Sequence, residues 1–261
     1  MINALIVLYN KKINNSATYK SIKDYQYINI IVFDNSDYNY REFNKNYCNN
    51  NQITYYTLEK NVGLSKAYNY TIDRINKNKK DYILILDDDT HLNKSYISEA
   101  YNLILQEQFD IILPIVKSNN QIISPEEVQF NCRIKKIKNL DKINYNNISA
   151  INSGMIIRTE IFNTIRYNEE MFLDYIDHDF MKKVREYKLI IKIMKSSIYQ
   201  EFSRNQKNDI RREKTRFNLY LKDFYIYCKN CNALLFYKIS ILKYKIHECK
   251  KYKTFDFLKI N

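Results

Sequence analysis

Short runs of Ile, Val and Leu alternate with stretches of helical length, and this alternation constrains the fold most strongly. The runs lie at residues 5–8, 28–33, 52–57 and 82–86. Such runs between polar turns are typical of buried strands. Residues 64–78 place apolar side chains at helical spacing before the last of these runs. Strand–helix–strand repetition predicts an α/β fold with a mostly parallel, doubly wound central sheet and right-handed crossovers.

The rest of the chain shows a weaker pattern. We expect strands at residues 111–116 and 154–157, with strand character between 121 and 132, and helices that begin at Thr159 and near Asp177. Residues 208–261 are rich in Lys and Tyr and read as mostly helical. With 261 residues, the chain fits one large domain with an appended tail. We predict a domain at 1–205, with halves 1–115 and 116–205, and a basic, aromatic-rich helical extension at 206–261.

Composition narrows the function and the cellular location. The chain holds only 2 Gly, so we expect Asn14–15 and Asn49–51 to supply left-handed turns. A net charge of +13 favours an anionic partner, which could be nucleic acid, an acidic membrane or a phosphorylated substrate. The 5 cysteines and the apolar start without a charged leader predict a reducing cytoplasm and no signal peptide. No apolar run reaches the roughly 20 residues of a membrane span.

Polar side chains follow the predicted strands at the edge where ligands bind in such sheets. Asp87, Asp88 and Asp89 come directly after a buried strand. Three adjacent carboxylates repel one another unless a cation neutralises them, and oxygen ligands suit Mg2+ or Mn2+. The alternatives are a solvated acidic turn and a phosphatase of the haloacid dehalogenase type. His91 weakens the second alternative, because that motif has Thr or Val at the fifth position.

Several segments together resemble the inverting nucleotide-sugar glycosyltransferases of family 2, which have the GT-A fold, and especially their rhamnosyltransferase-like bacterial branch. The resemblance covers about residues 3–200. The matching segments are ALIVLYN at 4–10, VFDNS at 32–36, NVGLSKAYN at 61–69, ILDDDT at 85–90, NSG at 152–154 and FLDYIDHDF at 172–180. Each motif is weak alone, but six in the expected order are specific.

The resemblance implies a UDP- or dTDP-sugar donor bound by the first half of the domain. Asp34 would accept a hydrogen bond from the imide of uracil or thymine. Asn61 and Gly63 would let the backbone approach the nucleotide. The other donor-side residues implied are Leu8 and Tyr9, which would line the base pocket, together with Lys66, Asp87 and Asp88.

The resemblance also implies a metal and a base. Asp89 would hold the Mg2+ or Mn2+ that bridges the two phosphates, with Asp87 in its shell or on the ribose. Asp177 matches the catalytic base, with Asp174 and Asp179 as candidate acceptor-binding residues or structural carboxylates. The family often completes the metal shell with a His on a later strand. Gln200 stands near that place and is a poorer ligand, so we expect weaker metal binding.

The tail bears on location and partners. Lysines interleaved with Tyr, Phe, Leu and Ile are typical of a helix that lies on anionic lipid, or of one that only caps the domain. We expect a cytoplasmic enzyme at the inner face of the cell membrane, acting on a glycan acceptor of a capsule or O-antigen that is linked to lipid. A zinc site at Cys228, Cys231, His247 and Cys249 is a weak alternative because the spacing is unusual.

Two other functions stay open. A nucleic-acid-binding protein would use the positive charge and the tyrosines, but acidic residues at the strand ends would repel a phosphate backbone, so we expect no nucleic acid partner. A sugar-nucleotide binder without catalytic activity is the other possibility, and Gln200 supports it.

Overall fold

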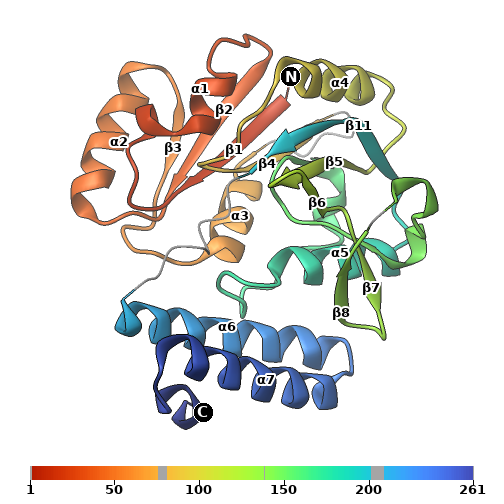
Figure 1. The fold of residues 1–261 in the computed structure, drawn as a ribbon. Coiled ribbons are helices and arrows are strands. Elements are labelled where there is room, and N and C mark those ends of the chain that lie inside the picture. Colours follow the sequence, from red (N-terminus) through yellow and green to blue (C-terminus); the bar gives the residue numbers. More distant parts are fainter. Residues whose placement is uncertain (1, 76–80, 138, 201–208, 261) are drawn as a thin grey trace.

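A mixed eight-stranded sheet forms the centre of the computed structural model, which describes residues 2–75, 81–137, 139–200 and 209–260 (Figure 1). The strand order is β11 (Ile191–Tyr199), β5 (Ile111–Ser118), β10 (Met155–Arg158), β4 (Tyr82–Asp87), β1 (Ile2–Leu8), β2 (Ile28–Asp34) and β3 (Thr54–Tyr56), with β6 (Gln121–Ser124) paired to β5. Only β10 and β6 run antiparallel to their neighbours among these strands as described. The predicted α/β fold with a mostly parallel sheet is confirmed.

Helices cover both faces of the sheet (Figure 1). One face carries α1 (Ala17–Ile22), α2 (Tyr38–Asn50) and α4 (Lys94–Leu105), and the other carries α3 (Leu64–Ile72) and α5 (Ile176–Glu186). The sheet separates two cores because strand side chains alternate: in β1, Leu5 and Val7 join the core of α3 and α5, whereas Ala4 and Ile6 join the other. Burial on both faces explains why these strands read as continuous apolar runs.

A smaller sheet lies beside α5. Its strands follow the order β8 (Arg133–Lys136), β7 (Glu126–Gln129) and β9 (Ile148–Ser149), all antiparallel. Short 3-10 segments complete the described chain at Ile13–Asn15, Leu140–Lys142, Tyr145–Asn147, Thr159–Asn163 and Asp256–Lys259. The strand character predicted for residues 121–132 therefore belongs to β6 and β7.

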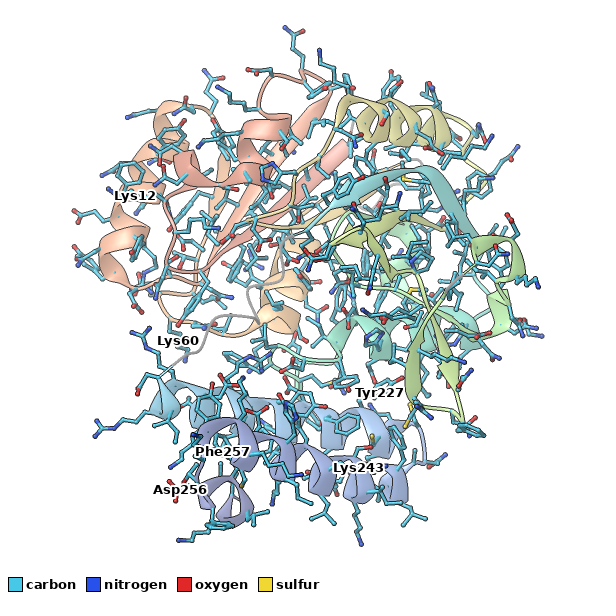
Figure 2. All side chains as sticks on the ribbon, viewed as in Figure 1. Lys12, Lys60, Tyr227, Lys243, Asp256 and Phe257 are labelled. Carbon is cyan, nitrogen blue, oxygen red and sulfur yellow. The ribbon has the colours of Figure 1, made fainter. Side chains whose placement is uncertain are left out.

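The chain ends in a helical hairpin of α6 (Ile210–Asn230) and α7 (Leu234–Tyr252). Buried α6 side chains, including Phe224 and Tyr227, belong to the same core as α5. Phe257 is enclosed by Phe217 and Tyr252 of the two helices (Figure 2). The predicted extension thus shares a hydrophobic core with the rest of the chain. No helix in the described ranges has the length and apolar character needed to cross a membrane.

Some sequence expectations differ from the structure in detail. The third strand is shorter than 52–57, and the helix expected at 64–78 ends at Ile72, with positions 76–78 outside the described residues. The helix expected from Thr159 is a 3-10 segment. The expected Asn turns are wrong: left-handed backbone occurs elsewhere, for example at Asn10 and Phe130. Propensity alone does not locate turns whose conformation depends on packing.

Candidate active site

The acidic turn lies where three neighbouring strands end. Asp34 closes β2 and Asp87 closes β4, and the two pair with the last residues of β1, Leu8 and Val7. The predicted convergence of carboxylates on one sheet edge is therefore present. Because side chains alternate along a strand, Asp87 lies on the side of α3 and α5, whereas Asp34 lies on the side of α2.

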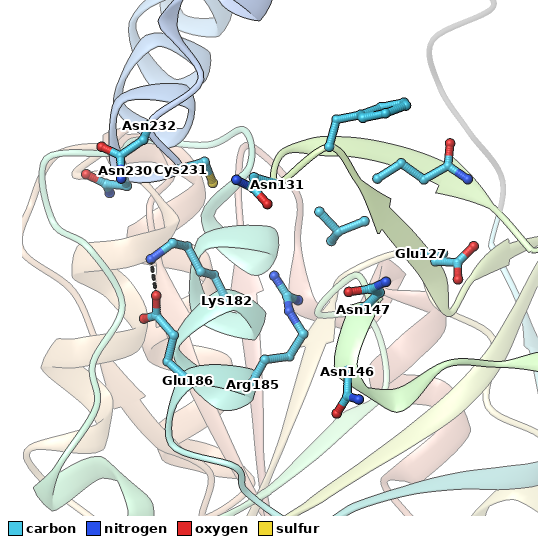
Figure 3. Close-up of a pocket in the computed structure, with 13 residues that line it drawn as sticks. Glu127, Asn131, Asn146, Asn147, Lys182, Arg185, Glu186, Asn230, Cys231 and Asn232 are labelled. Carbon is cyan, nitrogen blue, oxygen red and sulfur yellow. Dashed lines mark hydrogen bonds and ion pairs between the residues drawn. The ribbon is translucent and has the colours of Figure 1, made fainter.

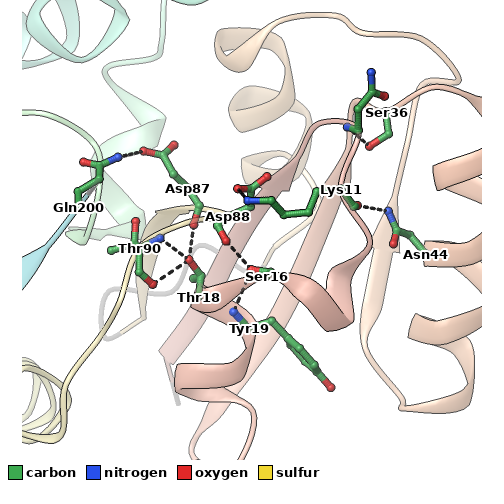
Figure 4. A network of polar contacts seen from close by, with 11 residues as sticks. Lys11, Ser16, Thr18, Tyr19, Ser36, Asn44, Asp87, Asp88, Thr90 and Gln200 are labelled. Atoms are coloured by element: carbon green, nitrogen blue, oxygen red, sulfur yellow. Dashed lines mark hydrogen bonds and ion pairs between the residues drawn. The ribbon is translucent and has the colours of Figure 1, made fainter. Parts of the chain in front are cut away.

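The start of α1 fixes the backbone of the acidic turn (Figure 4). The hydroxyl of Thr18 donates to the carbonyl of Asp87, and the hydroxyl of Ser16 donates to that of Asp88 at 2.7 Å. Lys11 forms an ion pair with the carboxylate of Asp88. Burial raises the pKa of Asp88, and Lys11 opposes that rise. Asp88 therefore has a cationic partner within the chain, which Asp87 and Asp89 lack among the described contacts.

Asp87 holds two segments that are distant in sequence. Its carboxylate accepts a hydrogen bond from Ser153 and another from the amide of Gln200, whose Nε2 lies 3.1 Å from Oδ2. Burial raises the pKa of Asp87 to about 6, Ser153 opposes this, and the charges of Asp89 and Asp88 add to it. A nearby positive charge would stabilise the ionised form of this buried carboxyl group.

Three buried oxygens at this turn have no hydrogen-bond partner in the described structure: Oδ1 of Asp89, Oγ1 of Thr90 and Oε1 of Gln200. Buried acceptors without donors are rare and fit a cation. In the part of the chain that the structure describes, no three His, Cys, Asp or Glu side chains group as a metal site. The described residues therefore offer few ligands, and phosphate oxygens and water would have to add to them in a Mg2+ or Mn2+ shell.

The residues expected around the nucleotide base differ in exposure. Tyr9 is 57% exposed at the end of β1, whereas Leu8 is buried in the core. Asp34 is fully buried, and its carboxylate accepts from the backbone N–H of Ser36 at 2.9 Å and from Asn44 at 2.8 Å. These bonds give Asp34 a structural role in holding α2 against β2. Its hydrogen bond to the uracil or thymine ring of a nucleotide stays a prediction.

Gly63 is required by a close approach within the chain. Its φ is +81°, and an added Cβ would lie 2.6 Å from the carbonyl oxygen of Phe172. The same oxygen accepts from the N–H of Leu64 at 2.7 Å, and Asn61 accepts from the N–H of Gly63 at 3.0 Å. Gly63 thus joins the start of α3 to the loop before α5. Lys66 is exposed on the first turn of α3.

A carboxylate on α6, which no sequence motif predicted, holds the loop before the predicted catalytic base. Asp223 is fully buried and accepts from three consecutive backbone N–H groups at 2.7–2.9 Å, those of residues 172, 173 and 174. Beside it, Arg216 binds the carboxylate of Asp174 through both of its terminal nitrogens. The C-terminal hairpin therefore sets the position of this loop.

Asp177 lies in the first turn of α5, two residues after Tyr175, whose backbone is left-handed at φ 58°. The Tyr175 ring stacks on Phe224 and Tyr227 of α6, at 4.7 Å and 5.0 Å between ring centroids. Packing of this kind can hold a strained residue, and strain is commonly kept at functional sites. Asp177 is partly exposed, with its Oδ1 accepting from the N–H of His178 at 2.8 Å.

Asp177 and Asp87 act on a common neighbour. Tyr68 is fully buried, and its pKa is raised by burial first and then by the charges of Asp87, Tyr167 and Asp177. The Tyr68 ring also lies 4.9 Å from that of Tyr167, which stacks on Phe180 of α5 at 4.5 Å between ring centroids. The strand-end acid and the first turn of α5 therefore border the same core, and a common site for Asp87 and Asp177 stays a prediction.

The residues beside Asp177 have structural partners. Asp179 is buried and lies 2.8 Å from the amide of Asn230 and 3.2 Å from Lys183. The side chain of His178 is mostly buried, and its Nδ1 lies 2.8 Å from the hydroxyl of Ser149. Neighbouring β9 covers this side of α5, a contact that helical spacing alone does not reveal.

The cysteines of the C-terminal region are buried in the core or partly exposed. Cys228 lies 3.9 Å from Cys132, sulfur to sulfur, and His247 is exposed on α7. The described residues do not assemble the zinc site considered above.

A model of glycosyl transferase family 2 matches residues 4–166, and the chain belongs to that family. It is 22% identical over 206 residues to the dTDP-rhamnosyl transferase RfbF of Shigella flexneri, across 74% of this chain and 66% of that relative. The chain thus spans just under two thirds of the relative that it matches.

Solved structures show the same fold. Residues 1–349 of TarS from S. aureus superpose with a TM-score of 0.55 at 19% identity, over 98% of this chain and 89% of that one. TarS in complex with UDP-GlcNAc gives 0.56 at 20% identity, over 80% and 60% of the two chains. GalNAc-T7 with UDP, GalNAc and Mn2+ gives 0.58 at 11% identity, over 77% and 44%. The GT-A architecture expected from the sequence motifs is confirmed.

Proposed function

We propose that this protein is an inverting glycosyltransferase that moves rhamnose or a hexose from a UDP- or dTDP-sugar to a hydroxyl of a surface-polysaccharide acceptor. The observation that carries the proposal is the packing of Tyr68 and Tyr167 against α5, because it sets the helix that carries Asp177 on the face of the sheet where the side chain of Asp87 lies. Family 2 membership and the names of the relatives, a dTDP-rhamnosyl transferase and a UDP-GlcNAc complex, support the donor class.

In this mechanism Asp177 acts as the general base. An acceptor hydroxyl is a weak nucleophile at neutral pH, and a carboxylate that takes its proton during attack lowers the barrier. Attack from the side opposite the leaving diphosphate inverts the anomeric carbon. Asp223 and Arg216 hold the loop that precedes the base. This restricts the position of the Asp177 carboxylate relative to the substrate.

The leaving group would bind at the acidic turn. Asp89, with Gln200 and Asp87 beside it, would hold a divalent ion that offsets the charge developing on the nucleoside diphosphate. Lys11 already neutralises Asp88, so the remaining negative charge of the turn is concentrated on Asp87 and Asp89.

The C-terminal hairpin supports contact with an anionic membrane. The exposed face of α7 carries an apolar stripe at helical spacing, which consists of Leu235, Ile239, Leu242 and Ile246. Lys238, Lys243 and Lys250 are also exposed on this helix. Apolar side chains flanked by lysines match the chemistry of an anionic lipid surface, where a lipid-linked acceptor would be found. We place the enzyme at the inner face of the cell membrane on this basis.

The test is a transfer assay with Asp177→Asn. Release of UDP or dTDP from a panel of nucleotide sugars is measured with oligosaccharide acceptors. We expect the variant to lose about 100-fold or more in rate, while the affinity for the nucleotide stays unchanged. Glu170→Gln is the matched control and should keep the wild-type rate, because it removes an exposed carboxylate from the loop before α5. Loss of nucleotide affinity in Asp177→Asn would show that the base is wrongly assigned.

A further inference from the structure

A cavity of about 810 Å3 lies away from the acidic turn, between the β7–β8 hairpin, the last turns of α5 and the turn from α6 to α7 (Figure 3). Asn131 lines it from the hairpin, Arg185 from α5 and Asn232 from the turn between α6 and α7. None of the residues given a role in catalysis or donor binding lines this cavity.

The lining is rich in side-chain amides that the protein does not use. In the described structure, the amides of Gln129, Asn131, Asn146, Asn147 and Asn232 make no hydrogen bond to other protein groups, yet all five residues line the cavity. Each amide offers two donors and an acceptor. They are therefore free to bind a ligand that carries both donors and acceptors.

The charges of the lining balance. Lys182 and Arg185 are cationic, and Glu127 and Glu186 are anionic. Lys182 and Glu186 form an ion pair, drawn in Figure 3. A chain with a net charge of +13 thus has a cavity without excess positive charge. Such a lining favours a neutral ligand over a phosphate-rich one.

Phe130 lies at the cavity in the tight turn of the β7–β8 hairpin, where the N–H of Cys132 donates to the carbonyl of Gln129 and Phe130 and Asn131 both have positive φ. Its side chain is 84% exposed, and its backbone is left-handed at φ 49°. Such turns favour Asn and Gly over a bulky residue, and an exposed ring gains little from burial. A ring kept in solvent at such a position is available to stack on a ligand.

We propose that this cavity binds a neutral segment of the glycan acceptor. Side-chain amides match the vicinal hydroxyls of a sugar, and the C–H face of a pyranose packs on the negative face of an aromatic ring. The inference rests on the proposed function, since it assumes a glycan acceptor, and it adds a second binding site for that substrate.

The position of the cavity suits this role. Asp177 and Arg185 lie on the same helix, eight residues apart, which corresponds to roughly 12 Å along its axis. Strand β7 connects the same two places. It begins at Glu126, whose carboxylate lies 3.7 Å from Nε2 of His178, and it ends at the hairpin turn that contains Phe130. An oligosaccharide of a few sugars, with one end at Asp177, can therefore reach the cavity. Binding there would hold a growing chain near the base between transfers.

The test uses the full chain and a panel of short neutral and phosphorylated oligosaccharides, with binding measured by saturation-transfer NMR. Phe130→Gly removes the ring and relieves the left-handed strain, so the melting temperature should hold. We expect its affinity for neutral oligosaccharides to fall about tenfold or more. Phe130→Trp keeps an aromatic face and should retain binding. Phe255→Ala removes an aromatic ring that is 77% exposed elsewhere and should change nothing.

The proposal is overturned if the wild-type protein binds no neutral oligosaccharide, if only phosphorylated ones bind, or if Phe130→Gly binds like wild type. Nucleotide binding by the same preparations separates this failure from failure of the proposed function. Nucleotide binding without oligosaccharide binding would contradict only the proposed glycan site in the cavity. Ring-dependent oligosaccharide binding without any nucleotide binding supports the cavity and contradicts the transferase.

Discussion

Gln200 donates a hydrogen bond from Nε2 to Oδ2 of Asp87, across 3.1 Å, and its Oε1 is left buried without a donor. This geometry places an amide oxygen beside the acidic turn, where family resemblance leads one to expect a His. Amide oxygens are ordinary ligands for Mg2+ and weaker ones for transition metals than imidazole. Gln200→His should therefore raise the affinity for Mn2+ more than that for Mg2+, as measured by calorimetric titration in the presence of UDP. Equal affinities in the two proteins would place Gln200 outside the metal shell.

The raised pKa of Asp87 makes folding stability depend on pH. Burial raises this pKa from 3.8 to about 6, so the native protein holds the proton more tightly than the unfolded chain. The stabilising effect is complete below about pH 4 and is lost as the pH rises to about 6. With chelator present, Asp87→Asn should gain about 2 to 4 kcal/mol relative to wild type between pH 4 and pH 7, by urea unfolding. A pH-independent difference would show that Asp87 titrates normally.

Asp223 should control the loop before the base. Asp223→Ala leaves the N–H groups of residues 172, 173 and 174 without their acceptor, so we expect a loss of about 3 kcal/mol or more in unfolding free energy. The transfer rate should fall while nucleotide binding is kept. Asp256→Asn, on an exposed ion pair with Lys214, serves as the control and should be nearly neutral. Unchanged transfer in a folded Asp223→Ala protein would contradict a positioning role.

The two glycines should respond differently to substitution. Gly63→Ala adds a Cβ 2.6 Å from the backbone oxygen of Phe172, which cannot move without shifting the loop. Gly154→Ala adds one at the same distance from the end of the Ile198 side chain, which can rotate. Both positions have positive φ, so the strain is matched. Thermal unfolding should show a loss of about 2 to 4 kcal/mol for Gly63→Ala and less for Gly154→Ala.

The apolar stripe of α7 should govern membrane binding. Changing Leu235, Ile239, Leu242 and Ile246 to Gln should abolish sedimentation with vesicles that contain anionic lipid, because the exposed apolar area is lost. Binding of the wild-type protein should weaken with added salt and with neutral lipid, because the lysines contribute about 1 kcal/mol each near a charged surface. Sedimentation of the Gln variant at the wild-type level would mean that another surface contacts the membrane.

Sequence patterns predicted what depends on local order and on the general rules of parallel sheets. The apolar runs at 5–8 and 82–86 predicted strands β1 and β4. The end of the second run predicted that Asp87 to Asp89 lie at the edge of the sheet where ligands bind. Contacts between distant segments were not predictable. The carboxylate of Asp223 meets N–H groups about 50 residues earlier, and nothing in its surroundings in the sequence marks it. Gly63 was expected to approach a ligand, and the structure shows that it approaches Phe172.

The measurement that tests the central claim most directly is thermal unfolding with UDP, dTDP, GDP or CMP, each with Mn2+, Mg2+ or chelator. A ligand that binds only the native protein raises the melting temperature by mass action. We predict a rise with UDP or dTDP that needs the metal and that is lost in Asp89→Asn. No rise with any nucleotide, together with a rise on adding nucleic acid, would contradict the account and favour a nucleic-acid-binding protein.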